Sequence, residues 1–599
     1  MSVQDANGAP APRGDGVLVS PTRLTATARP GSTQVFHVTV TNTGADARTV
    51  RPSAQTLETA PLAGDSGALD LPLATAPTFV DGGGTTGAYE LHQFTVPAGT
   101  DRLDGDIAWD GKDQRNSRVR ETLFDPFGRL AAYSLPQGPG GAGHVDVHDP
   151  APGTWTAVLW TQKNGTAYTG TVQFSFASRR FVPAGAVAPA SRLLAPGASG
   201  SFTVRVPLPA DAGDVSARLA IGTGGDADGS IPITVRSLVA LGAAGGAFQG
   251  TLTGGNGRPV FGAQTLDFQF DVPRGRPSLG LALQLRDPDY NLTGVLIDPA
   301  GEPVDEQSTG VVTGGTTAFG TGMQFFARTP SAGRWTLVLA LNAPLSGAQV
   351  REPFTGRIDF GSVPVSASGL PDSAGVTLAA GQPVTATIQV QNTGVRQKDF
   401  FVDARLANRS PQALVGTTPL TVQLPLLAGQ AAPTVVVPTD TDQLTIVASA
   451  TAPVLMHVAH VLNGPQVEGL TIGDVSIATH GAPEVASGPW TAFPTEVGPF
   501  GGGPAPALPV SVAAVADTAA FDPAASASSG DVWRRAVDAS AAYTPLTLAP
   551  GASGAITVTF TPAGPAGTVV RGTLELDTFD PLTSMGDEVV SIPYVYTVG

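Results

Sequence analysis

Four short stretches of the chain alternate apolar and polar residues directly after a turn. The two most regular copies, 195–206 and 549–560, share the sequence Ala-Pro-Gly-Ala-Ser-Gly, and looser copies lie at 29–40 and 379–390. In each copy apolar side chains occupy every second position, which predicts a β-strand with one buried face. Four copies indicate a chain built by repetition, in which such strands form one half-buried layer of an antiparallel sandwich.

A second pattern occurs twice in full and once in a degenerate form. Asp-Pro-x-Gly lies at 125–128 and 298–301, and it fits a type I turn with Asp first, Pro second and Gly fourth. A Gly-x-Trp-Thr strand follows each turn and recurs at 488–491. Its tryptophan falls where one face of the strand turns inward. The predicted core anchors of three sandwiches are therefore Trp155, Trp335 and Trp490.

Two of the alternating strands end in Asn-Thr-Gly, at 42–44 and 392–394. Asn and Gly tolerate the positive φ of a tight turn, so both copies predict a hairpin. The least regular stretch, 498–540, is expected to be a linker or a long loop.

These patterns predict an all-β protein of tandem β-sandwiches in which two module types, A and B, alternate. The expected divisions are a flexible leader at 1–15, A1 at 16–81, B1 at 82–179, A2 at 180–243, B2 at 244–362, A3 at 363–430, a degenerate B3 at 431–525, and A4 at 526–599.

Composition narrows the function classes. The net charge of −16 argues against nucleic acid as a partner, because that partner requires basic patches, and it fits an extracellular surface. The absence of cysteine excludes disulfides and thiolate metal sites. No apolar run reaches the length of a membrane span, and the N-terminal residues lack the pattern of a signal peptide. No Gly-rich loop precedes a predicted helix, so nucleotide binding is unsupported.

Several segments resemble the long C-terminal region of secreted actinobacterial subtilisin-like serine proteases. They are 130–137, 143–147, 152–158 and the Ala-Pro-Gly-Ala-Ser-Gly strands, and the resemblance covers about 16–599. It implies that the A modules are fibronectin type III-like or immunoglobulin-like sandwiches. The B modules would be jelly-roll-like, as in the bacterial pre-peptidase C-terminal domain. Three lysines against thirty arginines agree with a GC-rich, actinobacterial source.

The resemblance also implies a function. In that family such a region is a non-catalytic accessory tail that lies downstream of a catalytic α/β domain. The implied localisation is extracellular, although this chain shows no signal peptide. The implied partners are a protein or polysaccharide substrate, or the upstream catalytic domain, with neither nucleic acid nor membrane.

The chain shows no recognisable catalytic triad, so we assign no catalytic residue. Ser584, in Leu582-Thr-Ser-Met-Gly586, is read as part of a hairpin turn, because strand-like residues follow it instead of a helix. Gly64-Asp-Ser-Gly67 imitates another nucleophile motif and is read as a polar loop; His37, upstream of it, is placed on an exposed strand face. Thr479-His-Gly481 is read as holding a loop histidine.

His144, Asp146 and His148 share one face of a predicted strand and are candidate Zn²⁺ ligands. The equivalent positions of B2 are Gln324, Phe326 and Arg328, which favours a solvated strand face instead. His457 and His460 are expected on opposite faces of a strand, as packing or surface residues.

Two acidic patches are candidate Ca²⁺ sites, with ordinary turn carboxylates as the alternative. One comprises Asp104, Asp106, Asp110 and Asp113, and the sparser one Asp287, Asp289 and Asn291. Neither has the regular spacing of a calcium loop, so we assign no metal or cofactor residue, and Ca²⁺ is the one ion kept open.

The leading hypothesis is the non-catalytic accessory region, with roles in substrate binding, spacing or stabilisation. The alternative is a free-standing extracellular adhesion or carbohydrate-binding protein, which exposed aromatic platforms would favour. A third hypothesis, a hydrolase with an unfamiliar site, requires convergent polar residues that recur between modules.

Overall fold

The computed structural model describes residues 16–111, 117–134, 141–223, 227–254, 265–313, 316–361, 363–426, 430–460, 466–470, 475–480, 485–496 and 507–599. Nearly every element in these ranges is a β-strand, and one helix, α1 (Val532–Val537), is found among them. The predicted all-β class is confirmed. The leader at 1–15 and Asp113 lie outside the described residues.

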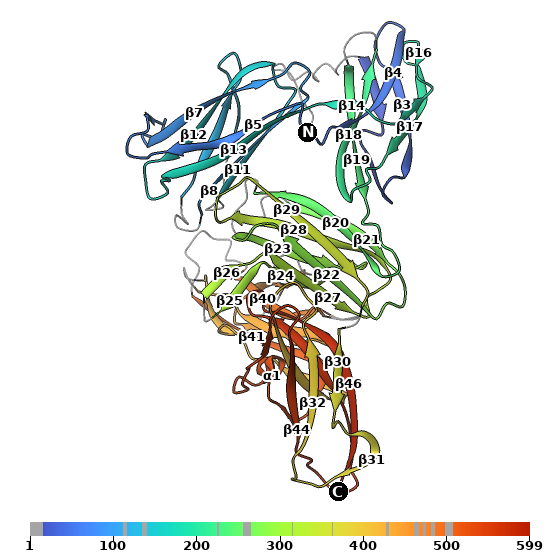
Figure 1. Cartoon of the computed structure of the whole chain (residues 1–599), viewed down its shortest axis with the longest axis vertical. Coiled ribbons are helices and arrows are strands. Elements are labelled where there is room, and N and C mark those ends of the chain that lie inside the picture. Colours follow the sequence, from blue (N-terminus) through green and yellow to red (C-terminus); the bar gives the residue numbers. More distant parts are fainter. Residues whose placement is uncertain are drawn as a thin grey trace.

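The strands form five sandwiches, each with its own apolar core (Figure 1). The expectation of seven separate modules is corrected here, because modules A1 and A2 are two halves of one sandwich, and so are A3 and A4. We call these composite sandwiches 1 and 2. Sandwich B1 is inserted into composite sandwich 1, B3 is inserted into composite sandwich 2, and B2 lies between the two composites along the chain.

Composite sandwich 1 combines strands from both sides of B1. One sheet has the order β1 (Val17–Ser20), β3 (Thr33–Asn42), β17 (Ser199–Pro207), β15 (Ala186–Ala188). The other has the order β14 (Phe181–Pro183), β4 (Arg48–Leu57), β18 (Gly213–Gly222), β19 (Ala227–Ser237), β2 (Leu24–Ala28), with β16 (Arg192–Leu194) also on β4.

Composite sandwich 2 repeats this plan around B3. One sheet has the order β30 (Val365–Ser368), β32 (Val384–Gln391), β44 (Ser553–Phe560), β42 (Ala525–Ala527). The other contains β31 (Asp372–Leu378), β46 (Met585–Val598), β45 (Val569–Asp580), β33 (Lys398–Ala413) and β43 (Leu546–Leu548). This second sheet continues without a break into B3 and has nine strands in all.

The repeated strands pair with their own copies, which explains why the module boundaries were wrong. Strand β3 pairs antiparallel with β17, so that Val38 lies opposite Phe202, and β32 pairs with β44, so that Ile388 lies opposite Ile556. Each copy has one apolar face, and neither half alone has enough strands to cover it. Alternation predicts a strand and its buried face but does not name the neighbouring strand.

The Asn-Thr-Gly sequences do not form the predicted hairpins. Each one connects the two opposite sheets of a composite sandwich, from β3 to β4 and from β32 to β33. Asn42 is fully buried; its amide donates to the carbonyls of Asp46 (2.8 Å) and Leu194 (2.9 Å), and its Oδ1 accepts from the Gly44 N–H (3.0 Å). Asn392 makes the same three bonds with Arg396, Leu548 and Gly394. The asparagine is therefore selected for its hydrogen bonds and not for a positive φ.

We expect Asn392→Ala to lower the free energy of unfolding by about 2–3 kcal/mol, because two carbonyls and one N–H lose their buried partner. Chemical unfolding followed by tryptophan fluorescence measures the loss. Thr393→Ala, at the exposed neighbouring position, is the matched control and should change the free energy little. Equal losses in the two variants would contradict this role for the Asn392 amide.

Sandwiches B1 and B2 have the same two-sheet plan. The first strand of B1 begins at Ala63, earlier than the predicted start of this module at 82. In B1 one sheet has the order β10 (Leu130–Tyr133), β9 (Arg120–Phe124), β12 (Gly153–Gln162), β7 (Thr86–Val96), β6 (Thr78–Val80). The other sheet of B1 has the order β11 (Ala142–His148), β8 (Arg102–Trp109), β13 (Gly170–Arg179), β5 (Ala63–Leu71). In B2 one sheet has the order β21 (Thr265–Val272), β28 (Gly333–Pro344), β23 (Tyr290–Ile297), β24 (Pro303–Ser308). The other sheet of B2 has the order β20 (Gly245–Thr253), β29 (Arg351–Asp359), β22 (Ser278–Leu285), β27 (Gly322–Arg328). Strands β25 (Gly310–Thr313) and β26 (Thr316–Phe319) form a separate hairpin.

Sandwich B3 has one sheet of its own and shares the other with composite sandwich 2. Its own sheet has the order β35 (Thr434–Val437), β40 (Gly488–Glu496), β37 (Val454–His460), β38 (Gln466–Leu470). The shared sheet adds β34 (Thr421–Leu424), β41 (Leu508–Phe521), β36 (Thr441–Ala450) and β39 (Val475–His480). Because β41 and α1 lie within 498–540, the expected linker there is instead largely ordered structure.

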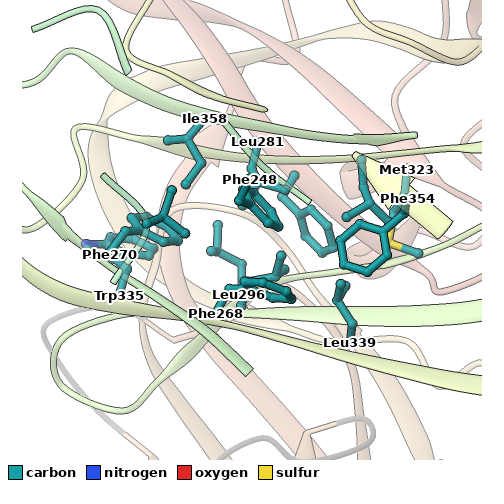
Figure 2. Packing of buried hydrophobic residues seen from close by; sticks show 14 of the residues in the cluster. Phe248, Phe268, Phe270, Leu281, Leu296, Met323, Trp335, Leu339, Phe354 and Ile358 are labelled. Carbon is teal, nitrogen blue, oxygen red and sulfur yellow. The ribbon is translucent and has the colours of Figure 1, made fainter. Parts of the chain in front are cut away.

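The three predicted tryptophan anchors are confirmed. Trp155, Trp335 and Trp490 are at most 2% exposed, and each indole N–H donates to the carbonyl four residues earlier, at 2.8–2.9 Å. Figure 2 shows Trp335 with Phe270, Leu281 and Ile358 in the B2 core. The Asp-Pro-x-Gly turns are confirmed too, since the N–H groups of Gly128 and Gly301 donate to the carbonyls of Asp125 and Asp298.

Candidate functional site

The residues that imitate protease motifs are separated by the fold. Ser584 lies in the turn between β45 and β46 with φ +57°, and its N–H donates to the Asp580 carbonyl, as the predicted hairpin requires. Gly64–Gly67 lies in strand β5 and not in a polar loop. Along that strand Asp65 faces inward and bonds the His92 ring at 2.9 Å, whereas Ser66 points to the opposite face. Asp65 and His92 therefore form a pair without Ser66.

The remaining histidines mostly follow their predicted faces. His37 is exposed on β3, as predicted. His460 is buried against Trp490 and bonds the Ser487 carbonyl at 2.9 Å, whereas His457 lies on the other face of β37 near Phe493. His480 is the last residue of β39 instead of a loop residue.

The candidate zinc residues of B1 meet two of the four calcium candidates, Asp104 and Asp106, on one sheet face. Strands β11 and β8 place His144 opposite Asp106 and Asp146 opposite Asp104. His144 Nδ1 lies 2.8 Å from Asp106, and the Arg102 guanidinium holds Asp146 through three hydrogen bonds, with His148 3.7 Å from Asp146. Asp104 pairs with Arg179 at 3.2 Å. These carboxylates therefore face cations of the protein.

The same face reaches the next sandwich, because Arg351 of B2 lies 3.4 Å from Asp106. In the second acidic patch, Asp287 pairs with Arg286 and Gln349, while Asp289 lies in a turn with φ +67°. Nowhere in the residues that the structure describes do three or more His, Asp or Glu side chains form a group able to hold a metal ion.

Contacts between arginine and carboxylate side chains lie at the junctions between the sandwiches. Composite sandwich 1 meets B1 through Arg218 and Asp101 (2.9 Å) and meets B2 through Arg236 and Asp267 (3.3 Å). The other junctions follow the same rule: Arg351–Asp106 between B1 and B2, Arg328–Glu588 between B2 and composite sandwich 2 (3.1 Å), and Arg409–Asp440 between composite sandwich 2 and B3 (3.0 Å).

The densest junction surrounds Arg405 of β33, which is only 2% exposed. Its guanidinium bonds the Asp403 carboxylate and, across the junction with B3, the Thr439 carbonyl at 2.7 Å. Glu588 of β46 lies 3.7 Å from Arg405 and also contacts Arg328 of B2. Glu588 and Arg405 together thus connect B2, composite sandwich 2 and B3. We call Arg405, Asp403, Glu575, Asp577, Glu588 and Arg328 the Arg405 cluster.

Carboxyl groups outnumber guanidinium groups in this cluster, and burial makes their ionisation unfavourable. Burial, with the charges of Glu588 and Asp403, raises the pKa of Asp577 well above its ordinary value. Burial likewise raises the pKa of Glu588 to about 8, although Arg405 opposes the shift. Neither oxygen of Asp577 accepts a hydrogen bond within the described part of the chain. The cluster therefore holds protons at pH values where free carboxyls are ionised.

A second group of polar residues joins B2 to composite sandwich 2. Arg396, next to β33, bonds Asp580 and, across the junction, the Gln307 side chain of β24 at 2.7 Å. It also donates to the Ser308 carbonyl. The planar guanidinium group can satisfy several acceptors at once, which suits a junction of this kind.

Neither group matches a catalytic or metal-binding pattern, so neither was predicted from the sequence. One signal was present: Asp403-Ala-Arg405 and Glu575-Leu-Asp577 put charged residues inside otherwise apolar strands. A charge at such a position is rarely left without a partner when buried.

No family model matches the chain, and the search of curated proteins found no match. Among solved structures, tripeptidyl peptidase 2 (TPP II) is similar over 98% of this chain, with 11% identity and a TM-score of 0.23, and this chain spans 40% of its length. The PapD-like domain 7 of human CEP192 is similar over 40% of this chain and 98% of its own, with 12% identity and a TM-score of 0.15.

The CBM51-2 and INT domains of Clostridium perfringens ZmpB are similar over 30% of this chain and 43% of their own, with 11% identity and a TM-score of 0.14. With TM-scores this low, none of these likenesses carries an argument about this chain. No helix in the described part of the chain has the length and apolar character needed to cross a membrane.

Proposed function

We propose that this chain is a non-catalytic accessory region of a secreted subtilisin-like serine protease, and that it acts as a stiff spacer. One observation carries the proposal: buried or half-buried arginine–carboxylate contacts span the junctions between its sandwiches. Such contacts restrict rotation at a junction, whereas a flexible tether needs few of them. The extracellular location and the protease partner come from the family resemblance of the sequence.

The native protein in the culture fluid of the producing organism tests this proposal. We expect a species larger than this chain, with a catalytic domain ahead of residue 1 when its N-terminus is sequenced. The purified chain should not hydrolyse casein. Hydrolysis that a serine-protease inhibitor abolishes, or a native protein that remains inside the cell, would overturn the proposal.

The alternative is a free-standing adhesion or carbohydrate-binding protein, and one observation favours it. The ring of Phe127, in the turn between β9 and β10, is 72% exposed, with the Arg129 guanidinium 4.8 Å from its centre. Exposed aromatic rings stack on sugar rings and on protein partners. Co-sedimentation with insoluble polysaccharides that Phe127→Ala abolishes would support this alternative.

A further inference from the structure

Sandwiches B1 and B2 have equivalent edges. In B1, Leu130 of β10 lies opposite Phe124 and the register shifts before Ala132; in B2, Pro303 of β24 lies opposite Ile297 and the register shifts before Asp305. On the other sheet, β11 and β27 are the equivalent edge strands. We call the pair of edge strands, β10 with β11 or β24 with β27, the open edge.

In B2 the open edge is covered by composite sandwich 2. Both β24 and β27 contact β46. Gln307 bonds Arg396, Arg328 bonds Glu588, and the Gln324 side chain lies against Gly394 so closely that a Cβ there would overlap it. The open edge thus receives the start of β46 and the 392–398 loop, which begins with the buried Asn392.

In B1 the equivalent edge is exposed along β10, and B2 contacts the start of β11 at Ala142. Leu130 and Tyr133 of β10 are 58% and 55% exposed. A hollow of about 480 Å³ lies between β10 and β11 and is lined by these residues with His144 and Asp146. Exposed apolar residues around a hollow mark an interaction surface.

The surface that covers the open edge of B2 has a counterpart in composite sandwich 1. The 42–48 loop has the same buried asparagine with the same three hydrogen bonds as the 392–398 loop. Thr43, Ala45, Asp46 and Ala47 in it are exposed. The three atoms nearest to a Cβ added to Gly44 belong to Asn42 and Arg48, whereas those nearest to a Cβ added to Gly394 belong to Gln324 of B2.

These two surfaces do not meet within one copy of the chain. The 42–48 loop lies at the start of β4, whereas B1 is connected at the end of β4, where β4 stops at Leu57 and β5 begins at Ala63. Nine residue steps along a strand separate the two ends by roughly 30 Å. The return connection, from β13 at Arg179 to β14 at Phe181, holds B1 at that far end.

We propose that the open edge of B1 binds the 42–48 loop of a second copy of this chain, repeating between copies the contact that B2 makes with composite sandwich 2. Each copy offers both surfaces, so two copies form a closed pair with two equal contacts. Charged residues of the B2 edge, Asp305 and Glu306, correspond to Ala132 and Tyr133. The contact between copies is therefore more apolar than the one within the chain. This inference does not depend on the proposed protease partner.

Sedimentation velocity of the whole chain, from about 1 to 100 µM, tests the proposal. We expect a concentration-dependent dimer, and Leu130→Asp should shift it to monomer, because a charge would be buried at a position that is apolar in both edges, Leu130 in B1 and Pro303 in B2. Leu91→Asp is the matched control: Leu91 is 54% exposed on β7, which β9 and β12 separate from β10 in the same sheet, so this variant should still dimerise. A monomer at every concentration, or a dimer that Leu130→Asp leaves intact, overturns the proposal.

Cysteine cross-linking then tests which surfaces meet, because the chain contains no cysteine of its own. A Tyr133→Cys chain mixed with an Asp46→Cys chain should give a mixed disulfide-linked dimer under mild oxidation, and Leu91→Cys with Asp46→Cys should not. Equal yields from the two mixtures would refute the assigned contact, and so would the absence of cross-linking in a sample that sediments as a dimer.

Discussion

Replacement of Arg405 by methionine should lower the free energy of unfolding of composite sandwich 2 by about 3–5 kcal/mol. The methionine keeps the aliphatic length of the side chain but leaves Asp403, which is fully buried, without its counter-charge. It also removes two hydrogen bonds to Thr439, so the junction with B3 loosens. Urea unfolding followed by the fluorescence of the buried Trp490 and Trp533 reports on both sides of that junction.

Arg409→Met is the control for this prediction. Arg409 comes from the same strand and also pairs across the junction, with Asp440, but its side chain is 33% exposed. Exposed ion pairs contribute little, so its loss should cost less than about 1 kcal/mol. Similar losses in Arg405→Met and Arg409→Met would show that burial of Arg405 is not what matters.

The second large effect is a pH dependence of stability that Asp577→Asn should reduce. Burial raises the pKa of Asp577 and the pKa of Glu588, the latter to about 8. Between the ordinary pKa of a carboxyl group and pH about 8, the folded chain therefore binds more protons than the unfolded chain. Stability from these groups is therefore highest at acidic pH, falls as pH rises toward about 8, and stays low above it. The uncharged asparagine should raise the free energy of unfolding at pH 8 by about 2 kcal/mol and change it little at pH 4.5.

Urea unfolding of the unmodified chain and of Asp577→Asn at pH 4.5, 6.5 and 8 measures the difference between their free energies of unfolding. Groups that titrate in the same way in both proteins contribute equally and cancel from this difference. Asp271→Asn is the matched control, because its carboxylate is 54% exposed beside Arg334 and lies outside the Arg405 cluster. A gain for Asp577→Asn that is the same at all three pH values would refute a role for proton binding.

The sequence predicted strands and turns well because local chemistry determines them. Alternation placed Val38, Phe202 and Ile556 in cores, and Asp-Pro-x-Gly specified its turn without help from the rest of the chain. The pairing of β3 with β17 was not predictable in this way, because it depends on residues about 160 positions apart. Asn42 was misread for a related reason: its partner Leu194 is remote in the sequence.

The charged junctions were harder to predict than the cores. His144, Asp146 and His148 were correctly grouped on one strand face. The sequence did not reveal that Asp106, Arg102 and Arg351 lie beside them. Arg405 and Asp577 were overlooked because single charges in apolar strands match no catalytic or metal-binding spacing. Their partners are set by the contact of whole sandwiches, which no local pattern encodes.

The insertion of B1 into composite sandwich 1 has a consequence for biosynthesis. Strand β3 leaves the ribosome long before β17, and all strands of B1 are made in between. B1 therefore completes its fold while β1 to β4 still wait for their partners, with apolar faces uncovered. Composite sandwich 2 repeats this order around B3. A nascent chain of this protein thus needs protection at two separate times, each ending when the returning half of a composite sandwich emerges.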